Sequence, residues 1–206
     1  MNEMASNREA DNGIVDVEIA GAGRRIAAYL INILLTLLAY VPLIAGIISA
    51  LPEGVFSQGA AGNEEAVAGM LAEADWSGSW IWFGLAVMAV YGLGQIWLMS
   101  RSGQSFGKKI MQIRVLKSDG RNPGFWGTVV LREILFNIIV TFAAMIAGYL
   151  LALAAGSSTL TADTIGNVLS FVPWIICLFM LFNKSKNRRT LQDMLADTVV
   201  VRLPGK

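Results

Sequence analysis

The stretch RSGQSFGKKIMQIRVLKSDGRNPGFWGTVVLREI, residues 101–134, is a basic segment punctuated by glycines in a chain that is otherwise mostly apolar. Of the whole chain, 55% is hydrophobic and 15% is charged, and the mean hydropathy is +0.57. Soluble globular domains are less apolar and carry about 25% charged residues. The composition therefore indicates an integral membrane protein, and its topology depends on the side of the bilayer on which this segment lies.

Apolar runs flank the basic segment on both sides. Each is close to the roughly 20 helical residues that cross a hydrocarbon core of about 30 Å. They are residues 26–50, 79–100, 135–155 and 165–182. The first run starts too late for a cleavable signal peptide, and the residues before it are polar and acidic, so we expect the N-terminal segment to be retained. The sequence predicts an all-α membrane protein, a bundle of four transmembrane helices.

The sign of the charge alternates from one connecting segment to the next. All 16 Lys and Arg residues lie before the first span, between the second and third, or after the fourth. The other two loops, 51–78 and 156–164, carry only acidic residues: Glu53, Glu64, Glu65, Glu73, Asp75 and Asp163. Basic loops stay on the cytoplasmic side. We therefore predict that both termini and the loop 101–132 are cytoplasmic and that 51–78 faces outward.

This topology divides the chain into three parts. We expect a polar cytoplasmic tail (1–23), a transmembrane domain (24–182) and a cytoplasmic C-terminal segment (183–206) that packs on the domain. In the outer loop, Asn63 is a good helix-capping residue with acids directly after it. We predict a short amphipathic helix over 64–74.

The run Gly103-Gln-Ser-Phe-Gly107-Lys108-Lys109 comes close to a phosphate-binding loop. It is one residue short of the G-x-x-x-x-G-K-[ST] spacing and has Lys109 where the metal-binding hydroxyl belongs. It also follows a membrane span, whereas such loops follow a buried strand. We therefore attribute its charge to topology and expect no nucleotide.

The residues after this run change pattern. Ile113 and Val115 are typical of a short strand, 119–120 is an Asp-Gly turn, and Pro123 breaks the chain before the next helix. The β-branched residues in 197–203 are also typical of a strand. Both segments are on the predicted cytoplasmic side, so we expect them to pair into a small β element.

These segments resemble the RDD family, a group of mostly bacterial multi-span membrane proteins. The resemblance lies in Gly-Gln-Ser-Phe-Gly-Lys-Lys (103–109), Ile-Arg-Val (113–115), Asp-Gly (119–120), Leu-Arg-Glu (131–133), the start of the first span (24–31) and the segment 191–200. It implies a multi-pass protein of the bacterial inner membrane and, as its function, transport of ions or small solutes.

The family is named for one arginine and two aspartates, and the resemblance is incomplete at these positions. Arg25 fits the arginine and Asp193 the second aspartate, but the first aspartate falls at Asn32. The histidine that often precedes the second aspartate falls at Gln192. If the intramembrane carboxylate carries the family's activity, this chain lacks it, which argues against a proton-carrying role.

Arg25, Tyr29 and Asn32 share one helix face, because residues at i, i+4 and i+7 are neighbours along a helix. An amide in lipid is costly unless it is paired, so Asn32 should face the bundle, with Gln95 and Asn137 as polar partners at depth. We favour a role in holding helices together, for about 0.6–2 kcal/mol. The alternative is a substrate ligand.

Four charged residues are expected at the cytoplasmic mouth of the bundle: Arg25, Arg132, Glu133 and Asp193. We predict that Asp193 pairs with Arg25 first or Arg132 second, since topology places all three on one side. A clamp that docks the C-terminal segment on the bundle is the favoured interpretation. An ion or anionic-ligand site at the entrance is the alternative.

Small residues repeat every four positions in the third span, at Ala144, Gly148, Ala152 and Gly156. Such a ladder lets two helix backbones approach closely. The sequence does not specify whether the partner is another span or another subunit.

Several chemistries are excluded by composition. With no His and one Cys, Cys177, the chain has no structural zinc site and no Cys-His nucleophile, and no intramolecular disulfide can form. Nothing indicates an enzyme, a cofactor or a nucleic-acid partner, and the basic face suits contact with anionic lipid. Two functions remain: a transporter, or a non-transporting membrane subunit that scaffolds a partner complex, with homo-oligomers open in either case.

Overall fold

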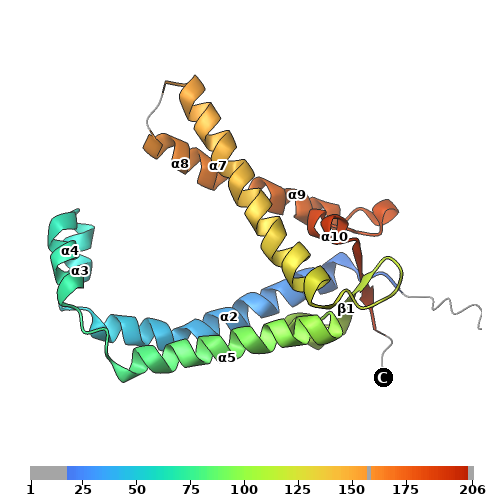
Figure 1. The fold of residues 1–206 in the computed structure, drawn as a ribbon, viewed down its shortest axis with the longest axis horizontal. Coiled ribbons are helices and arrows are strands. Elements are labelled where there is room, and N and C mark those ends of the chain that lie inside the picture. The colour runs from blue at the N-terminus through green and yellow to red at the C-terminus, as the bar shows by residue number, and fades with distance from the viewer. Residues whose placement is uncertain (1–17, 157–158, 204–206) are drawn as a thin grey trace, which may run out of the picture. The chain divides into compact units, whose positions relative to one another are not determined.

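The computed structural model describes residues 18–156 and 159–203. Most of the predicted tail 1–23 and the last three residues of the C-terminal segment lie outside these ranges. Within them, four helical stretches are long and apolar enough to cross a membrane: Ala22–Ala50, Ser79–Ser102, Trp126–Ala154 and Ala162–Met180 (Figure 1). The chain is therefore a multi-pass membrane protein. It divides into two units, Leu30–Trp97 and Met1–Tyr29 with Leu98–Lys206.

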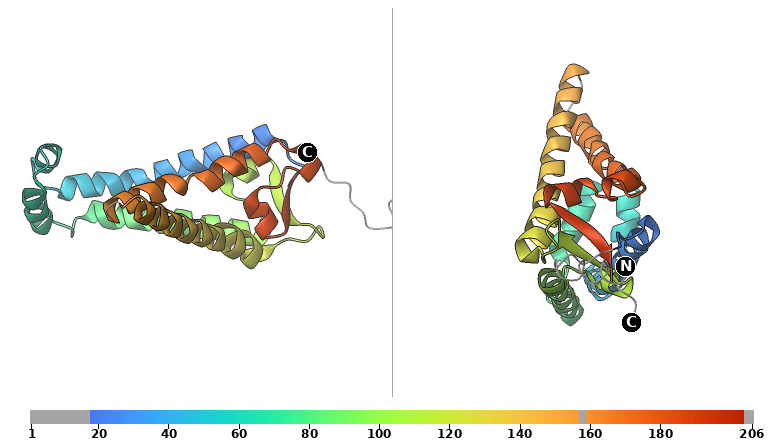
Figure 2. Two further views of the ribbon diagram at one scale, coloured as in Figure 1. Left: turned by 90° about the horizontal axis from the view of Figure 1, so that it is seen from above. Right: turned by 90° about the vertical axis from the view of Figure 1, so that its right-hand side faces the viewer.

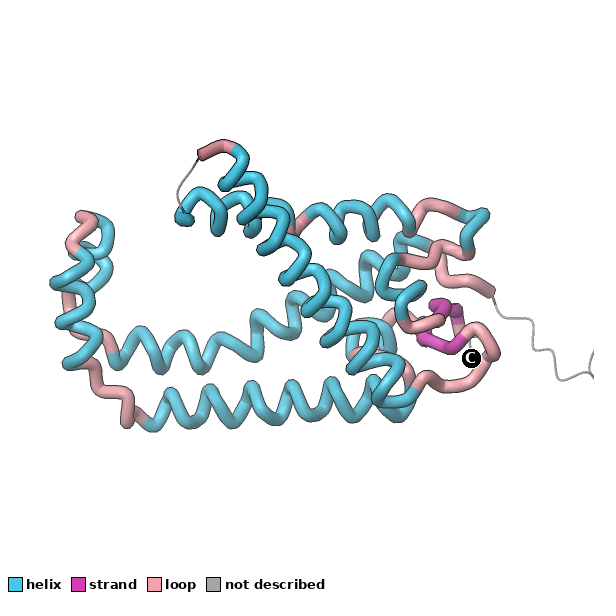
Figure 3. The backbone as a smooth tube through the Cα atoms, turned by 45° about the horizontal axis from the view of Figure 1, so that its top comes forward, coloured by secondary structure: helices cyan, strands magenta, loops and turns pink. Residues whose placement is uncertain are grey.

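In the unit Leu30–Trp97, two long helices run side by side (Figure 3). They are α2 (Ala22–Ala50) and α5 (Ser79–Ser102), both of which continue into the other unit. Their backbones are very close, since a Cβ atom at Gly84 would lie 2.4 Å from Leu43 Cα, and one at Gly46 would lie 2.7 Å from Ile81 N. α2 continues through Pro42.

The connection between α2 and α5 contains two short helices that lie side by side (Figure 2), α3 (Val55–Ala60) and α4 (Glu64–Glu73). The backbone N–H of Ala66 donates to Asn63 Oδ1 at 3.3 Å, so the predicted helix and its cap are confirmed. α3 was not predicted. Its six residues carry no acidic or basic end signal, and its N-cap Gly54 makes no side-chain cap.

In the other unit, the third span begins as a π-helix, η1 (Trp126–Leu135), and continues as α7 (Phe136–Ala154). The predicted start at residue 135, and with it the predicted loop end at 132, is wrong. Arg132 was placed in the cytoplasmic loop, but it is helical, and its charge is met by a buried carboxylate.

The small-residue ladder packs on a helix of the same unit, α8 (Thr159–Leu169). Ala144, Gly148 and Ala152 are buried, and a Cβ atom at Gly148 would lie 2.6 Å from the carbonyl oxygen of Ala162. Gly156 does not belong to the ladder. It lies beyond the end of α7 with a φ of +63°, a conformation that suits a glycine that ends a helix.

The fourth span, predicted as one run over 165–182, is broken into α8 and α9 (Val172–Met180). Pro173, in the first turn of α9, has no N–H, so the carbonyl of Leu169 cannot form the usual helical bond. The amides of Ser170 and Phe171 donate to Gly166 and Val168, which closes the end of α8. The break leaves Asn167 and Ser170 beside a backbone irregularity inside the span.

A two-stranded sheet confirms the predicted β element, with both strands in magenta in Figure 3. β1 (Ile113–Lys117) pairs antiparallel with β2 (Thr198–Arg202), with Ile113 opposite Arg202. A bridge between Ile19 and Val201 brings in the chain that leads to α2. The inward face forms an apolar core of Ala20, Ala28, Ile113, Val115 and Val200.

The loop that resembles a phosphate-binding loop anchors β1. Gly103 has a φ of +67° and accepts a hydrogen bond from the amide of Val115 at 3.0 Å. Gln104 Nε2 donates to the carbonyl of Ile113 at 2.9 Å, and the Ser105 side chain caps α6 (Phe106–Ile110). A Cβ atom at Gly103 would lie 2.4 Å from the Val115 oxygen, so glycine is required there by packing. The polar groups of this loop therefore bind the backbone of β1 and cap α6.

Candidate functional site

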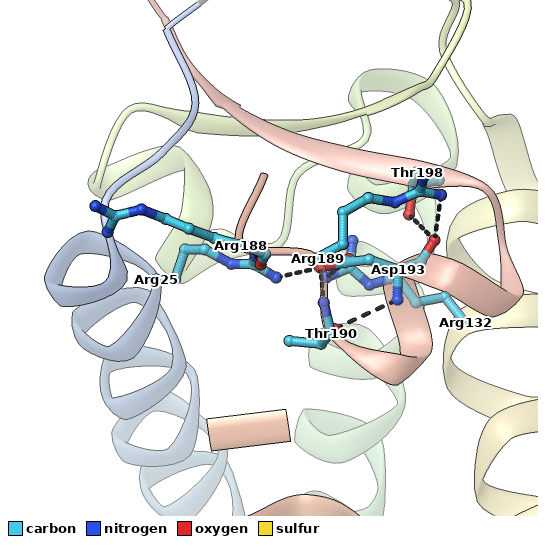
Figure 4. Close-up of polar contacts among 7 residues, drawn as sticks. All are labelled: Arg25, Arg132, Arg188, Arg189, Thr190, Asp193 and Thr198. Carbon is cyan, nitrogen blue, oxygen red and sulfur yellow. Dashed lines mark hydrogen bonds and ion pairs between the residues drawn. The ribbon is translucent and has the colours of Figure 1, made fainter. Parts of the chain in front are cut away.

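The centre of the candidate site is the carboxylate of Asp193 on α10 (Leu191–Leu195), drawn in Figure 4. Its orientation follows from a capping box in the local sequence Thr190-Leu-Gln-Asp193. The amide of Asp193 donates to Thr190 Oγ1 at 3.3 Å, and the amide of Thr190 donates back to Asp193 Oδ2 at 3.0 Å. The side chain of Asp193 is fully buried. A short helix start thus aims a carboxylate into the protein.

Two arginines from different spans meet this carboxylate. Arg25 Nη2 on α2 lies 2.5 Å from Asp193 Oδ2, and Arg132 Nη2 on η1 lies 2.9 Å from Asp193 Oδ1. Arg25 Nη1 also donates to the carbonyl of Arg188 at 2.5 Å. Both partners proposed from topology are therefore used at once. We call Arg25, Arg132 and Asp193 the arginine–aspartate cluster.

The protonation state of Asp193 follows from its surroundings. Burial would raise the pKa of Asp193, but Arg132, Arg25 and the amide of Thr190 outweigh it and lower the pKa to about 2. The residue is an anion at neutral pH. The cluster joins the start of the first span, the start of the third span and the C-terminal segment through one charge.

A second layer of polar contacts, absent from the sequence-based prediction, supports α10 (Figure 4). Arg189 Nη2 donates to the Asp193 carbonyl at 3.3 Å and to Asp197 Oδ1 at 2.8 Å. Thr198 Oγ1 donates to the same carbonyl at 3.4 Å. The Thr-x-x-Asp spacing is a sequence signal for the capping box that orients Asp193, but it does not point to Arg189 or Thr198.

Arg132 has donors that the cluster does not use. Its side chain is 5% exposed, and its Nε and Nη1 are buried without a hydrogen-bond partner among the described residues. Lys108, on α6, is half-buried, and the charge of Arg132 acts on it. Burial, followed by the charge of Arg132, lowers the pKa of Lys108 to about 7, and Glu133 and Asp193 oppose this shift. No sequence signal placed Lys108 here, because α6 is positioned by contacts with β1.

The remaining candidate residues lie outside the cluster. Asn32 is half-buried on α2, and its carbonyl accepts from the Tyr91 hydroxyl at 3.5 Å. Tyr29 is 57% exposed, and Gln95 is half-buried on α5. Asn137 Nδ2 donates to the carbonyl of Glu133 at 2.6 Å, within its own span. Among the described residues, no group of His, Cys, Asp or Glu is placed to hold a metal ion.

The sequence model of the RDD family matches residues 19–197. Among curated proteins and among solved structures, none matches the chain. The matched range contains all four spans, strand β1 and the three members of the arginine–aspartate cluster, and it ends just before β2. Arg25 and Asp193 lie near the two ends of that range and are in contact, and the chain belongs to the RDD family of membrane proteins.

Proposed function

We propose that this protein moves an ion or a small polar solute across a bacterial inner membrane, with both termini in the cytoplasm. The observation that carries the proposal is the break in the fourth span between α8 and α9. Discontinuous helices recur in transporters, where unwound backbone lies next to the solute path. Irregular backbone at membrane depth is tolerated where it is buried in protein or lines a water-filled cavity.

Polar side chains accompany the break. Asn167 is exposed on the surface of its unit, and Ser170 Oγ donates to the Asn167 carbonyl at 2.7 Å. An exposed amide is costly against lipid, so we expect Asn167 to face a polar path. The ionisable residues of the described spans lie toward their ends, as Arg25, Arg132 and Asp163 illustrate. This distribution favours a solute bound by amides and hydroxyls over a proton carried by a carboxylate at depth.

The flux prediction contrasts two asparagines. In proteoliposomes screened over cations, anions and proton gradients, Asn167→Leu should lower the flux of the transported solute by about tenfold, the effect of one lost hydrogen bond of about 1.4 kcal/mol. Asn32→Leu should instead lower stability in detergent by about 0.6–2 kcal/mol and leave flux largely intact. If Asn167→Leu kept the wild-type flux, the break between α8 and α9 would not line the path of the solute.

The same assay addresses the alternative role. A protein that moves none of the screened solutes, and that is stable only with a co-purifying partner, would favour a non-transporting subunit over a transporter. A stable homo-oligomer with measurable flux would support transport.

The proposed orientation is tested with single cysteines in a Cys177→Ala background. Gln58→Cys, before α4, should react with an impermeant maleimide from outside the cell, whereas Lys109→Cys on α6 should react only after the membrane is opened. The reason is that every Lys and Arg lies in the segments assigned to the cytoplasm. If Gln58→Cys reacted only from the cytoplasmic side, the proposed topology would be the reverse of the true one.

A further inference from the structure

We propose that the guanidinium of Arg132 and the ammonium of Lys108 form a binding site for an oxyanion, a phosphate-like group, at the start of the third span. This site is distinct from the arginine–aspartate contacts, which use other atoms of Arg132. It does not depend on whether the protein transports a solute.

The first observation is the unused face of Arg132. Its side chain is 5% exposed, and Nη2 is taken by Asp193 Oδ1 at 2.9 Å. Nε and Nη1 are buried and have no hydrogen-bond partner within the described part of the chain. Buried donors are nearly always satisfied, so two on one guanidinium require a partner that is not a protein group. A bound water or an anion can supply it.

The second observation, the nearby Lys108, favours an anion over a water. No hydrogen bond or ion pair to its ammonium is present among the described residues. Burial lowers the pKa of Lys108, and the charge of Arg132 is the next largest cause, so the Lys108 ammonium lies within electrostatic range of the Arg132 guanidinium. Two like charges within this range repel each other, and an anion bound between them would offset the repulsion.

The charges around Lys108 leave a surplus for an anion to neutralise. The groups that act on Lys108 are Arg25 on α2, Arg132 and Glu133 on η1, and Asp193 on α10. Asp193 is already engaged by both arginines, and Glu133 is half-buried beside them. With Lys108 protonated, three cations therefore face two carboxylates. A bound anion would offset this surplus of positive charge.

The donor chemistry specifies the kind of anion. A guanidinium offers planar N–H donors that match the oxygens of a phosphate or sulfate, and an ammonium adds a point charge. Arg132 lies on a π-helix, a form that occurs often at functional sites. Its place near the end of a membrane span is a level at which lipid phosphates lie. The oxyanion can therefore come from an anionic lipid or from solution.

The test uses sulfate, which does not change charge between pH 6 and pH 8, on the purified full-length protein. Thermal unfolding in detergent is followed against sulfate concentration at constant ionic strength. If binding requires protonated Lys108, the apparent Kd should be about tenfold weaker at pH 8 than at pH 6, because Lys108 titrates near pH 7. Lys108→Gln should abolish this saturable stabilisation.

The matched control is Lys109→Gln, the same charge change at the exposed neighbour on α6, which should behave as wild type. Glu133→Gln, which removes a nearby negative charge, should bind sulfate more tightly. Equal sulfate effects in wild type, Lys108→Gln and Lys109→Gln would show a general salt effect and overturn the site.

A second arm separates the two sources of the oxyanion. The same proteins are melted in mixed micelles that contain phosphatidic acid or, at equal mole fraction, phosphatidylcholine. Stabilisation by phosphatidic acid that Lys108→Gln abolishes, without a response to sulfate, identifies a lipid headgroup, and a sulfate response identifies a free oxyanion. No Lys108-dependent response in either arm would leave only water at Arg132 and refute the proposal.

Discussion

Replacing Asp193 by asparagine is expected to lower the free energy of unfolding by about 3–5 kcal/mol, the cost of leaving a buried charge without its partner. Arg25 and Arg132 would both lose their carboxylate while remaining 8% and 5% exposed. The amide that replaces it is neutral and cannot satisfy two guanidinium groups. Thermal or denaturant unfolding in detergent measures the loss.

The chain offers a matched control in Asp197→Asn, four residues away. Asp197 also contacts an arginine, Arg189, at 2.8 Å, but its side chain is 71% exposed. Exposed pairs contribute about 0–1 kcal/mol, so this variant should lose little. Equal effects at the two positions would contradict a buried cluster at Asp193.

A double-mutant cycle tests the coupling within the cluster. Arg25→Gln alone should be strongly destabilising, and combined with Asp193→Asn it should cost less than the sum of the two single changes. Strict additivity would mean that Arg25 and Asp193 do not interact.

The pH dependence of stability follows from the same carboxylate. The pKa of Asp193 in the folded protein is about 2, below the ordinary value of 3.8. Its contribution to stability is therefore complete above about pH 5 and is lost as the pH falls toward 2. Asp193→Asn should lack this part of the acid dependence.

The second large effect is expected at Gly84 on α5. Alanine there would place a Cβ atom 2.4 Å from Leu43 Cα and 2.5 Å from Leu43 N, so the backbones of α2 and α5 would have to separate. Overpacking of this kind costs about 1–3 kcal/mol, and more where backbone must shift. The lowered melting temperature of Gly84→Ala in detergent measures it.

Gly92, on the same helix, is the control, because a Cβ atom there meets nothing within 4 Å. Gly92→Ala should be neutral, or stabilising by up to about 1 kcal/mol through its better helix propensity. Similar losses at both positions would indicate that α5 does not approach α2 as closely as described.

The fold could be predicted from the sequence wherever one physical rule dominates. The lengths of the apolar runs predicted the four spans, and the β-branched residues predicted strands β1 and β2. The rule that basic loops share one side of the membrane predicted that Arg25, Arg132 and Asp193 lie near one another. The prediction left open which arginine binds Asp193, and the structure uses both, because a carboxylate has two oxygens.

The errors arose where tertiary contacts override local pattern. The third span includes Arg132, whose charge is met by Asp193, a residue far along the chain. The fourth span breaks before Pro173, a residue that many membrane helices accommodate as a kink. Lys108 could not be assigned to the site because Gly103 and Gln104 set the position of α6 through β1.

The arginine–aspartate cluster also has a consequence for the order in which the protein is made. Arg25 and Asp193 are 168 residues apart, so a ribosome delivers the carboxylate long after the first span has been handed to the membrane. Until then Arg25 and Arg132 lack the carboxylate that pairs with both of them in the folded protein, and their guanidinium groups need water in its place. The basic end of the nascent protein therefore stays open to solvent until α10 emerges, and assembly is completed by the C-terminal segment.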